Sequence, residues 1–400
     1  MDDKPRLRPV EVFPVEEGRG AMVCIRDATG LSDRVVTASV AVVPVLRMLD
    51  GTHNLLDIQA ALTRERGEIV FSDDIRQMLD VLDEALLLEG DRFEGHCRRL
   101  REDFADAPVR RATSAGGSYP AEAEALRVFL DEILASAELP ASTSRDLRGL
   151  IAPHIDHPRG RRSYADAYAA LAHAEPADLF VLLGTSHAPT TERFALTRKD
   201  FETPLGVART DVDVVDALLE RSSCDLLADE FVHRAEHSIE LELVFIQHLC
   251  EQAGRAFKIV PILCGSFPDA SPDALPGVVE VIDALRDLMN DAGRRVVIVA
   301  GADLAHVGPR FGGEQRVTPR MLADLERVDR ETLAFVEGGD ADGFFAFVMR
   351  DENARNICSV ASVYLSVKAL EPCAPTLLRY EQWSDDDGAS CVTFAAMAIQ

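Results

Sequence analysis

The feature that most constrains this chain is a set of short, continuously apolar runs between residues 147 and 400. Four of them are separated by longer stretches of helical character, and a fifth lies near the last residue; the runs are 150–152, 179–183, 259–263, 296–300 and 391–399. A strand with one face in water alternates apolar and polar residues, whereas a strand covered on both faces is apolar throughout. The runs therefore predict an α/β fold in which helices cover both faces of a sheet.

Helical spacing interrupted by turn signals characterises the first hundred residues. Residues 1–30 look irregular or weakly stranded, 35–49 form an apolar segment, and the helical segments are 55–62 and 73–88. Ser72 is predicted to cap the second of these helices. Residues 91–115 are charged and read as a linker helix, and residues 121–135 as an amphipathic helix. We expect a small, mainly helical domain over residues 1–100, a linker over 101–115 and a large domain over 116–400.

Histidine or aspartate follows three of the four apolar runs. The first run leads to His154, the second to His187, and the fourth to Asp303 and then His306, in a chain with only ten histidines. Ligands of α/β sheets bind beyond the carboxyl ends of the strands. Because a neutral imidazole is a good ligand for iron, copper and zinc, a metal site is predicted there. Composition offers Asp303 or Cys358 as a third ligand, and spacing does not choose between them.

A second polar segment, residues 233–240, precedes an apolar helical face. We expect His237 to lie at the start of this helix, where the local positive potential would lower its pKa and leave a neutral ring usable as a base. Glu236 and Glu240 are close enough in sequence to orient it. The remaining histidines considered, His157, His173, His233 and His248, are expected at the surface in contact with water. Residues 159–162 could hold an anionic substrate, but a solvated loop is the preferred interpretation.

Charge and composition exclude several classes of function. The net charge of −26 disfavours binding to nucleic acid, because such a surface repels phosphates. The sequence contains no run of about 18 apolar residues, so no membrane span is predicted, and the first residues lack the apolar core of a signal peptide. Eight scattered cysteines form no CxxC pair, which excludes a zinc knuckle or a thioredoxin-type motif and fits reduced thiols. We expect a cytoplasmic protein.

Several short motifs carry a family resemblance over residues 112–400. In chain order they are Gly117-Ser118-Tyr119-Pro120, Ala152-Pro153-His154, Gly184-Thr185-Ser186-His187, Glu236-His237-Ser238-Ile239-Glu240, Asp303-Leu304-Ala305-His306 and Asn356-Ile357-Cys358. The chain resembles Memo-like proteins, in particular the type called AmmeMemoRadiSam system protein B. The resemblance implies a fold similar to class III extradiol dioxygenases.

The same resemblance implies roles for the motif residues. It places His154, His187 and Cys358 on the metal positions of the family, His237 on an acid/base position, and Asp303 and His306 in a further pocket motif. It also implies iron or copper, redox chemistry, and radical-SAM and AMMECR-type partner proteins. The run after His154 departs from the family pattern, so Asp156 and His157 could add polar groups to the pocket or face solvent.

The region around Asp50-Gly51-Thr52 and the two helical segments after it resembles PqqD-like peptide-recognition modules of winged-helix size. A helical appendage that packs on the main domain is an equally good interpretation of this stretch.

Three functions compete. The leading hypothesis is a metal-dependent, dioxygenase-like oxidoreductase that acts on a small molecule or a peptide-linked substrate, with Fe(II) as the first choice and copper or zinc as alternatives. The second is a non-catalytic scaffold that binds a metal or ligand and recruits a peptide or a radical-SAM partner. The third is a metallohydrolase, which bound zinc would favour.

Overall fold

A computed structural model describes residues 4–16, 21–140, 143–267, 271–291 and 293–400. The chain divides into two compact units, Met1–Asp106 and Ala107–Gln400. The boundary between the units falls inside the segment 101–115 that the sequence suggests as a linker. Each unit has its own buried core and is described separately.

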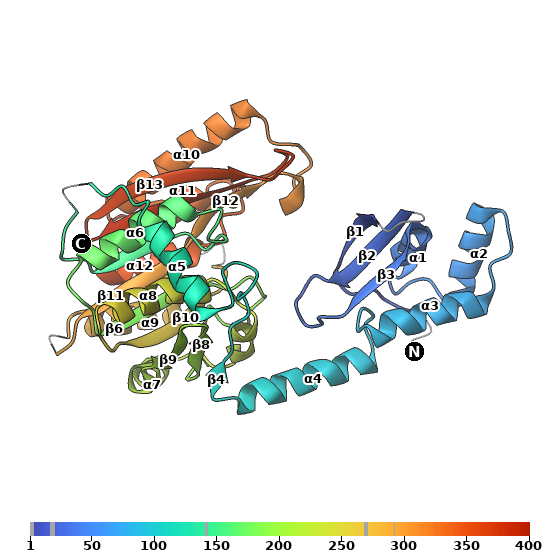
Figure 1. The fold of residues 1–400 in the computed structure, drawn as a ribbon, viewed down its shortest axis with the longest axis horizontal. Helices are drawn as coiled ribbons and strands as arrows, with labels where there is room; N and C mark the ends of the chain where they lie inside the picture. The colour runs from blue at the N-terminus through green and yellow to red at the C-terminus, as the bar shows by residue number, and fades with distance from the viewer. Residues whose placement is uncertain (1–3, 17–20, 141–142, 268–270, 292) are drawn as a thin grey trace. The chain divides into compact units, whose positions relative to one another are not determined.

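The first unit combines a small sheet with four α-helices (Figure 1). Its antiparallel strands, in the order β1-β2-β3, are Val10–Glu16, Ala21–Asp27 and Val35–Ser39. Its α-helices α1 to α4 are Val43–Met48, Leu55–Arg66, Ser72–Glu84 and Asp91–Asp106. The apolar segment 35–49 therefore divides into a strand and a helix, because a short apolar run fits either element until tertiary packing decides.

Local capping sets both ends of α2, but no side chain of a described residue caps the start of α3. Asn54 and Asp57 form a reciprocal capping box at the start of α2, and Gly67, with a φ of 69°, ends it. The prediction that Ser72 caps α3 is wrong: Phe71 is the cap residue, and the Ser72 hydroxyl donates to Gln59 Oε1 at 2.8 Å. The helix also ends at Glu84, before the predicted residue 88.

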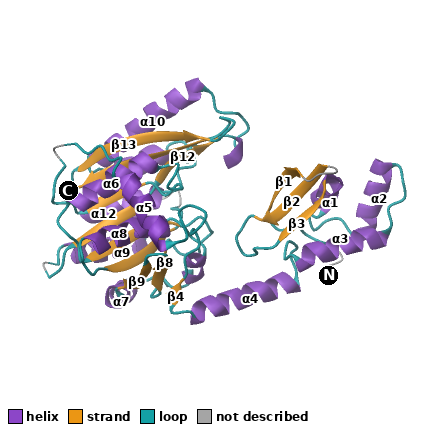
Figure 2. Cartoon of the chain, in the orientation of Figure 1, coloured by secondary structure: helices purple, strands orange, loops and turns teal. Residues whose placement is uncertain are grey.

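An 11-stranded sheet forms the centre of the second unit (Figure 2). Its main path runs β12-β14-β5-β11-β6-β10-β9-β8-β4, with β13 beside β14 and β7 beside β10. The central strands β5, β11, β6 and β10 pair in parallel, and they are Gly149–Ala152, Val296–Gly301, Leu179–Thr185 and Lys258–Cys264. They contain the four apolar runs, so the predicted strands are confirmed.

The remaining strands extend this sheet on both sides. The antiparallel strands β12, β13 and β14 on the β5 side are Asp303–Val307, Pro375–Ser384 and Cys391–Ile399. The short strands β4, β7, β8 and β9 on the β10 side are Val109–Arg110, Phe194–Leu196, Asp200–Thr203 and Gly206–Thr210.

Helices cover both faces of the sheet, as predicted for strands that are apolar throughout. On one face lie α5, α6 and α8, which are Ala123–Leu134, Arg161–His173 and Glu240–Gln252. On the other lie α7, α9, α10, α11 and α12, which are Val212–Arg221, Pro276–Met289, Pro319–Glu337, Ala341–Met349 and Val360–Leu370.

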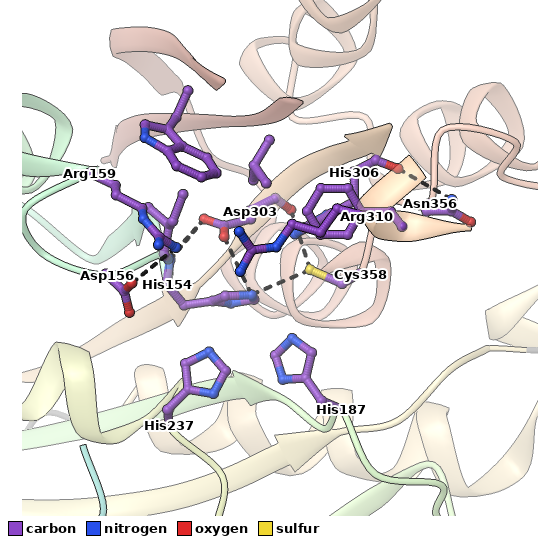
Figure 3. Close-up of a pocket in the computed structure, with 14 residues that line it drawn as sticks. His154, Asp156, Arg159, His187, His237, Asp303, His306, Arg310, Asn356 and Cys358 are labelled. Atoms are coloured by element: carbon purple, nitrogen blue, oxygen red, sulfur yellow. Dashed lines mark hydrogen bonds and ion pairs between the residues drawn. The ribbon is translucent and has the colours of Figure 1, made fainter. Parts of the chain in front are cut away.

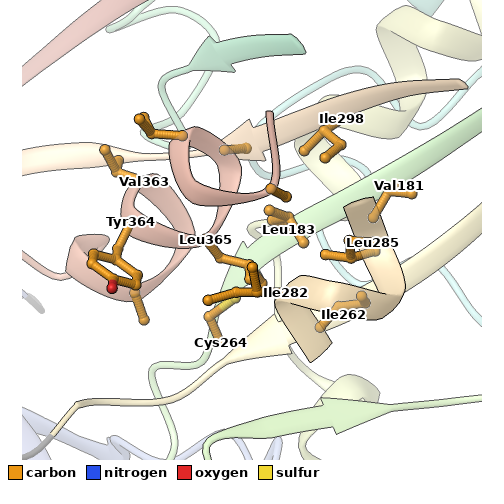
Figure 4. Close-up of a cluster of buried hydrophobic side chains, with 14 of the residues drawn as sticks. Val181, Leu183, Ile262, Cys264, Ile282, Leu285, Ile298, Val363, Tyr364 and Leu365 are labelled. Carbon is orange, nitrogen blue, oxygen red and sulfur yellow. The ribbon is translucent and has the colours of Figure 1, made fainter. Parts of the chain in front are cut away.

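Strand β6 shows how a single strand serves both cores. Leu179, Val181 and Leu183 belong to the cluster packed on α9 and α12, which Figure 4 draws in part. The residues between them, Phe180 and Leu182, belong to the cluster on the opposite face. Alternate side chains of a strand point to opposite faces, so a strand buried on both sides is apolar over most of its length.

The order of the central strands determines where the site lies. β11 is between β5 and β6, and all three run in the same direction. Their carboxyl ends therefore meet at one edge of the sheet, which is the edge where ligands bind in open α/β sheets. Among the described residues, none of the helices combines the length and the apolar character that a membrane crossing needs.

Candidate metal centre

His154, His187 and Cys358 converge at the carboxyl edge of the central strands (Figure 3). His154 follows β5, His187 follows β6, and Cys358 lies just before α12. The His154 Nε2 and Cys358 Sγ atoms are 3.4 Å apart, and the centroids of the two imidazole rings are 5.1 Å apart. One ligand atom from each of the three residues lies within 4.8 Å of the others. Such a set could hold one metal ion.

A backbone contact orients the His154 ring. Its Nδ1 donates to the carbonyl oxygen of Gly301, the last residue of β11, at 2.9 Å. This contact leaves the Nε2 lone pair directed toward Cys358. Burial, together with the neighbouring His187 and His237 rings, holds the pKa of His154 well below its usual value. The ring is therefore neutral near pH 7, the form in which imidazole binds a metal.

A carboxylate orients His187 in a similar way. Its Nδ1 lies 3.1 Å from both oxygens of Glu236, and its backbone N–H donates to the same carboxylate at 2.9 Å. Burial acts to lower the pKa of His187, but the Glu236 carboxylate outweighs burial and raises it. A carboxylate behind an imidazole is the usual outer partner of a histidine ligand, because it fixes the ring and increases its basicity.

Glu236 also contacts His237, so a single carboxylate links two of the site histidines. His237 Nδ1 lies 3.2 Å from Glu236 Oε1, and the His187 and His237 rings stack with centroids 4.9 Å apart. The backbone N–H groups of His237 and Ser238 donate to the same oxygen at 2.8 and 3.1 Å. His187, Glu236 and His237 thus form a second group of potential ligands that shares His187 with the first.

Two details of the prediction for His237 are corrected. The pKa of His237 is lowered as expected, but burial is the largest cause, and α8 begins only at Glu240. Within the residues that the structure describes, Glu240 forms no hydrogen bond or ion pair with the His237 side chain. It instead accepts hydrogen bonds from the backbone N–H of Ser114 at 2.8 Å and from the Tyr119 hydroxyl, and it pairs with Arg110.

Arg110 holds the turn that carries Glu236 and His237, and the sequence analysis did not identify it. Its buried guanidinium donates to the carbonyl oxygens of Glu236 at 2.6 Å and of His233 at 3.0 Å, and to the Glu240 carboxylate. The paired carboxylate is 130 positions away in the sequence. No local pattern around residue 110 indicates this role.

Asp303 and His306 both lie in β12 beside the three converging residues, but they differ in their contacts. Asp303 Oδ1 accepts from the His154 backbone N–H at 3.0 Å, and Oδ2 is 3.7 Å from His154 Nε2. Burial raises the pKa of Asp303. His306 Nδ1 donates to the carbonyl oxygen of Leu304 at 3.2 Å, and its ring packs edge-on against Phe311. Asp303 therefore supports His154, while His306 faces the adjoining cavity.

A cavity of about 510 Å³ opens onto these residues. This volume lies in the range typical of small-molecule sites. The polar lining residues are His154, Asp156, Arg159, His187, His237, Asp303, His306, Arg310, Asn356 and Cys358. The apolar lining residues are Ile155, Phe311, Trp383 and Val392.

Within residues 159–162, Arg159 and Arg162 are exposed, as expected for a solvated loop, but Arg159 also lines the cavity. Arg159 pairs with Asp156 at 3.0 Å and lies 4.3 Å from the centre of the Trp383 ring. Of the two residues left open between pocket and solvent, Asp156 lines the cavity. Arg310 and Trp383 were missed, and the only signal available was that Trp383 is the single tryptophan of the chain.

The surface prediction holds for His173 but is wrong for three other histidines. His157, His233 and His248 are buried, and each donates a hydrogen bond through Nε2. Their partners are the carbonyl oxygens of Leu241 at 3.0 Å and Ala195 at 2.9 Å, and the Asp131 carboxylate at 2.7 Å. Buried polar groups need such partners, and sequence spacing does not reveal them.

Comparison with known proteins gives a consistent result. Residues 110–398 match the family model described as Memo-like protein. A protein from Aquifex aeolicus, named MEMO1 family protein, is 26% identical over 399 residues, which cover 99% of this chain and 100% of the relative. A MEMO1 family protein from Methanosarcina mazei is 28% identical over 297 residues, covering 73% of this chain and 99% of the relative. The match to the Aquifex relative thus includes the first unit, whereas the Methanosarcina relative has the length of the second unit.

Proposed function

The chain belongs to the Memo-like family, and because three potential ligand atoms converge at its strand ends, we propose that it is a metal-dependent, dioxygenase-like oxidoreductase. In this proposal His154, His187 and Cys358 hold one metal ion, with Fe(II) as the first choice and copper as the second. The substrate is a small molecule or a peptide-linked group that enters the adjoining cavity. The observation that carries the proposal is the approach of the three ligand atoms to within 4.8 Å.

The chemistry of the donor set supports a transition metal. Two imidazoles and a thiolate suit iron, copper or zinc, whereas magnesium and calcium prefer oxygen ligands. The His154 ring is kept neutral by burial, and the Glu236 carboxylate supports His187 from behind. The Cys358 thiol binds a metal only as a thiolate, so loading the metal releases a proton.

The residues around the ligands supply positioning and proton transfer. When bound, iron or copper would supply redox chemistry toward O₂ together with open positions for a substrate. His237 takes a proton from the substrate and later returns it, because its lowered pKa leaves the ring neutral and able to accept. Glu236, 3.2 Å from His237 Nδ1, stabilises the protonated ring. Asp303 holds the His154 backbone, and His306 offers a polar contact at the cavity wall.

Elemental analysis of the full-length chain after anaerobic purification tests the proposal. The wild type should contain a stoichiometric transition metal, and His154→Ala, His187→Ala and Cys358→Ala should each lose most of it. His173→Ala is the matched histidine control, since that residue is exposed on α6, and Cys373→Ala is the matched cysteine control. Wild-type protein without metal above background, or ligand variants that keep the metal, would refute the proposal. Bound zinc with hydrolase activity and no O₂ consumption would move the function to a metallohydrolase.

A non-catalytic scaffold is the second candidate, and one observation favours it. The edge strand β3 and helix α3 of the first unit border a groove of about 270 Å³. In this alternative the first unit captures a peptide or a partner of the radical-SAM or AMMECR type, and the second unit retains its cavity for ligand recognition. A stable partner in pull-downs, combined with protein free of metal, supports this alternative over the enzyme.

A further inference from the structure

The cavity has an apolar wall that the proposed chemistry does not use. Ile155, Val392 and Phe394 form a small buried cluster, separate from the two main cores, against which Phe311 and Trp383 pack. All of these except Phe394 line the cavity. The cavity therefore has two kinds of surface, the histidines with Cys358 and this apolar wall. A ligand that fills it must have an apolar part.

Arg310 brings a positive charge to the same cavity. It lies in the short 3₁₀ helix Pro309–Phe311, and Figure 3 shows its side chain extending back over His154 and Asp303. Arg159, the other guanidinium of the lining, is already paired with Asp156 at 3.0 Å. In the described part of the chain, no carboxylate lies within 4.0 Å of the Arg310 guanidinium, although Asp and Glu outnumber Lys and Arg by 68 to 42. Arg310 is therefore available to an anion from outside the protein.

The backbone that carries Arg310 is held in place. The Arg310 backbone N–H donates to the Ser390 hydroxyl at 3.1 Å. Gly308, the residue before this 3₁₀ helix, has a φ of 102°, and a Cβ at this position would lie 2.5 Å from the carbonyl oxygen of Ala389. Because Gly308 has no side chain, the backbone before the 3₁₀ helix packs directly against the residues that precede β14. A cation on such a fixed segment binds an anion at a lower entropic cost than one on a mobile loop.

We propose that the cavity binds a small organic acid, with its carboxylate on Arg310 and its apolar body against Phe311 and Trp383. In this binding mode the end of the acid opposite its carboxylate would react beside His154 and Cys358. That reaction rests on the proposed function, whereas the binding of the acid does not. Recognition of the acid is a property of the apolar wall and Arg310, and it does not require a metal. A neutral apolar ligand and an inorganic anion are the two simpler occupants that an experiment must separate from it.

The single tryptophan of the chain makes the test direct, because Trp383 lines the cavity and reports its occupancy by fluorescence. Full-length protein, freed of metal with a chelator, is titrated with benzoate, with its neutral analogue benzamide, and with acetate, and calorimetry repeats each titration. Benzoate should bind more tightly than either other probe. Arg310→Gln should weaken benzoate binding at least about tenfold and leave benzamide unchanged, since a charge-assisted contact is lost. Arg310→Lys should keep part of the affinity.

Arg316→Gln is the matched control, because Arg316 lies close to Arg310 in the sequence, pairs with Asp387 and does not line the cavity. Equal affinity for benzoate and benzamide, or unchanged benzoate binding in Arg310→Gln, overturns the anion site. Acetate binding as tightly as benzoate overturns the role of the apolar wall. Because the titrations use metal-free protein, the outcome is independent of the elemental analysis: a chain without metal can still require Arg310 for benzoate, and a chain with metal can fail to bind it.

Discussion

Replacing Arg110 with methionine should destabilise the second unit by about 3–5 kcal/mol, the usual cost of removing one partner from a buried ion pair. The side chains of Arg110 and Glu240 are both fully buried. The change leaves the Glu240 carboxylate without its cation, and it leaves the carbonyl oxygens of His233 and Glu236 without their donor. Glu240 keeps the N–H groups of Thr113 and Ser114 and the Tyr119 hydroxyl, so we expect the lower end of the range.

The cost of Arg110→Met should depend on pH. Burial acts to raise the pKa of Glu240, but Arg110, first among the opposing causes, helps to hold it below the usual value. A carboxyl whose pKa is lowered by folding contributes stability above its unfolded pKa, about 4.3, and loses it as the pH falls through the folded pKa. Without Arg110 that contribution shrinks. The difference between wild type and variant should therefore be largest at neutral pH and smaller at pH 4.

Urea unfolding followed by Trp383 fluorescence measures this difference, because the only tryptophan of the chain lies in the second unit. Arg127→Met is the control, since Arg127 forms its ion pairs with exposed glutamates at the surface, and it should change stability little. The double variant Arg110→Met with Glu240→Leu should cost less than the sum of the two single changes, because neither then leaves a lone buried charge. Additive costs, or a loss below about 1 kcal/mol in Arg110→Met, would show that the pair does not hold this region.

Three further predictions concern other parts of the chain. Gly301→Ala should cost about 1–3 kcal/mol in the same urea assay, because its Cβ would lie 2.5 Å from the carbonyl oxygen of Ser238, whereas Gly117→Ala, with its nearest neighbour at 3.5 Å, should be tolerated; equal stability of the two variants would contradict this. Asp27→Asn should speed hydrogen exchange in residues 28–33 at neutral pH, because the Asp27 carboxylate accepts from backbone N–H groups of this loop. Hydrogen bonds outweigh burial and lower the pKa of Asp27, so the wild type should lose the same protection only as the pH falls through that lowered pKa. Unchanged exchange in the variant would contradict this role of Asp27. Burial raises the pKa of Glu242 well above its usual value, so wild-type stability should fall relative to Glu242→Gln as the pH rises above about 4.3, and parallel pH profiles in urea unfolding would refute this.

The sequence by itself determined the architecture of the second unit. A strand buried on both faces is apolar over most of its length, so runs such as residues 179–183 identify the central strands directly. The parallel strands of an α/β sheet end at a common edge, and this rule singled out His154 and His187 before their contacts were known. The helical segment predicted from residue 55 is likewise present as α2, whose capping box and terminal glycine are local interactions.

Only the tertiary structure decided which side chains meet. Cys358 approaches His154 across 204 positions of sequence, and Arg110 reaches Glu240 across 130, because the fold brings the start of α12 beside the end of β5, and β4 beside the start of α8. Periodicity and capping report interactions within a few residues, whereas such contacts depend on how helices and strands far apart in the sequence pack together. The burial of His157 and the position of Trp383 at the cavity follow from that packing, so no local sequence pattern predicted them.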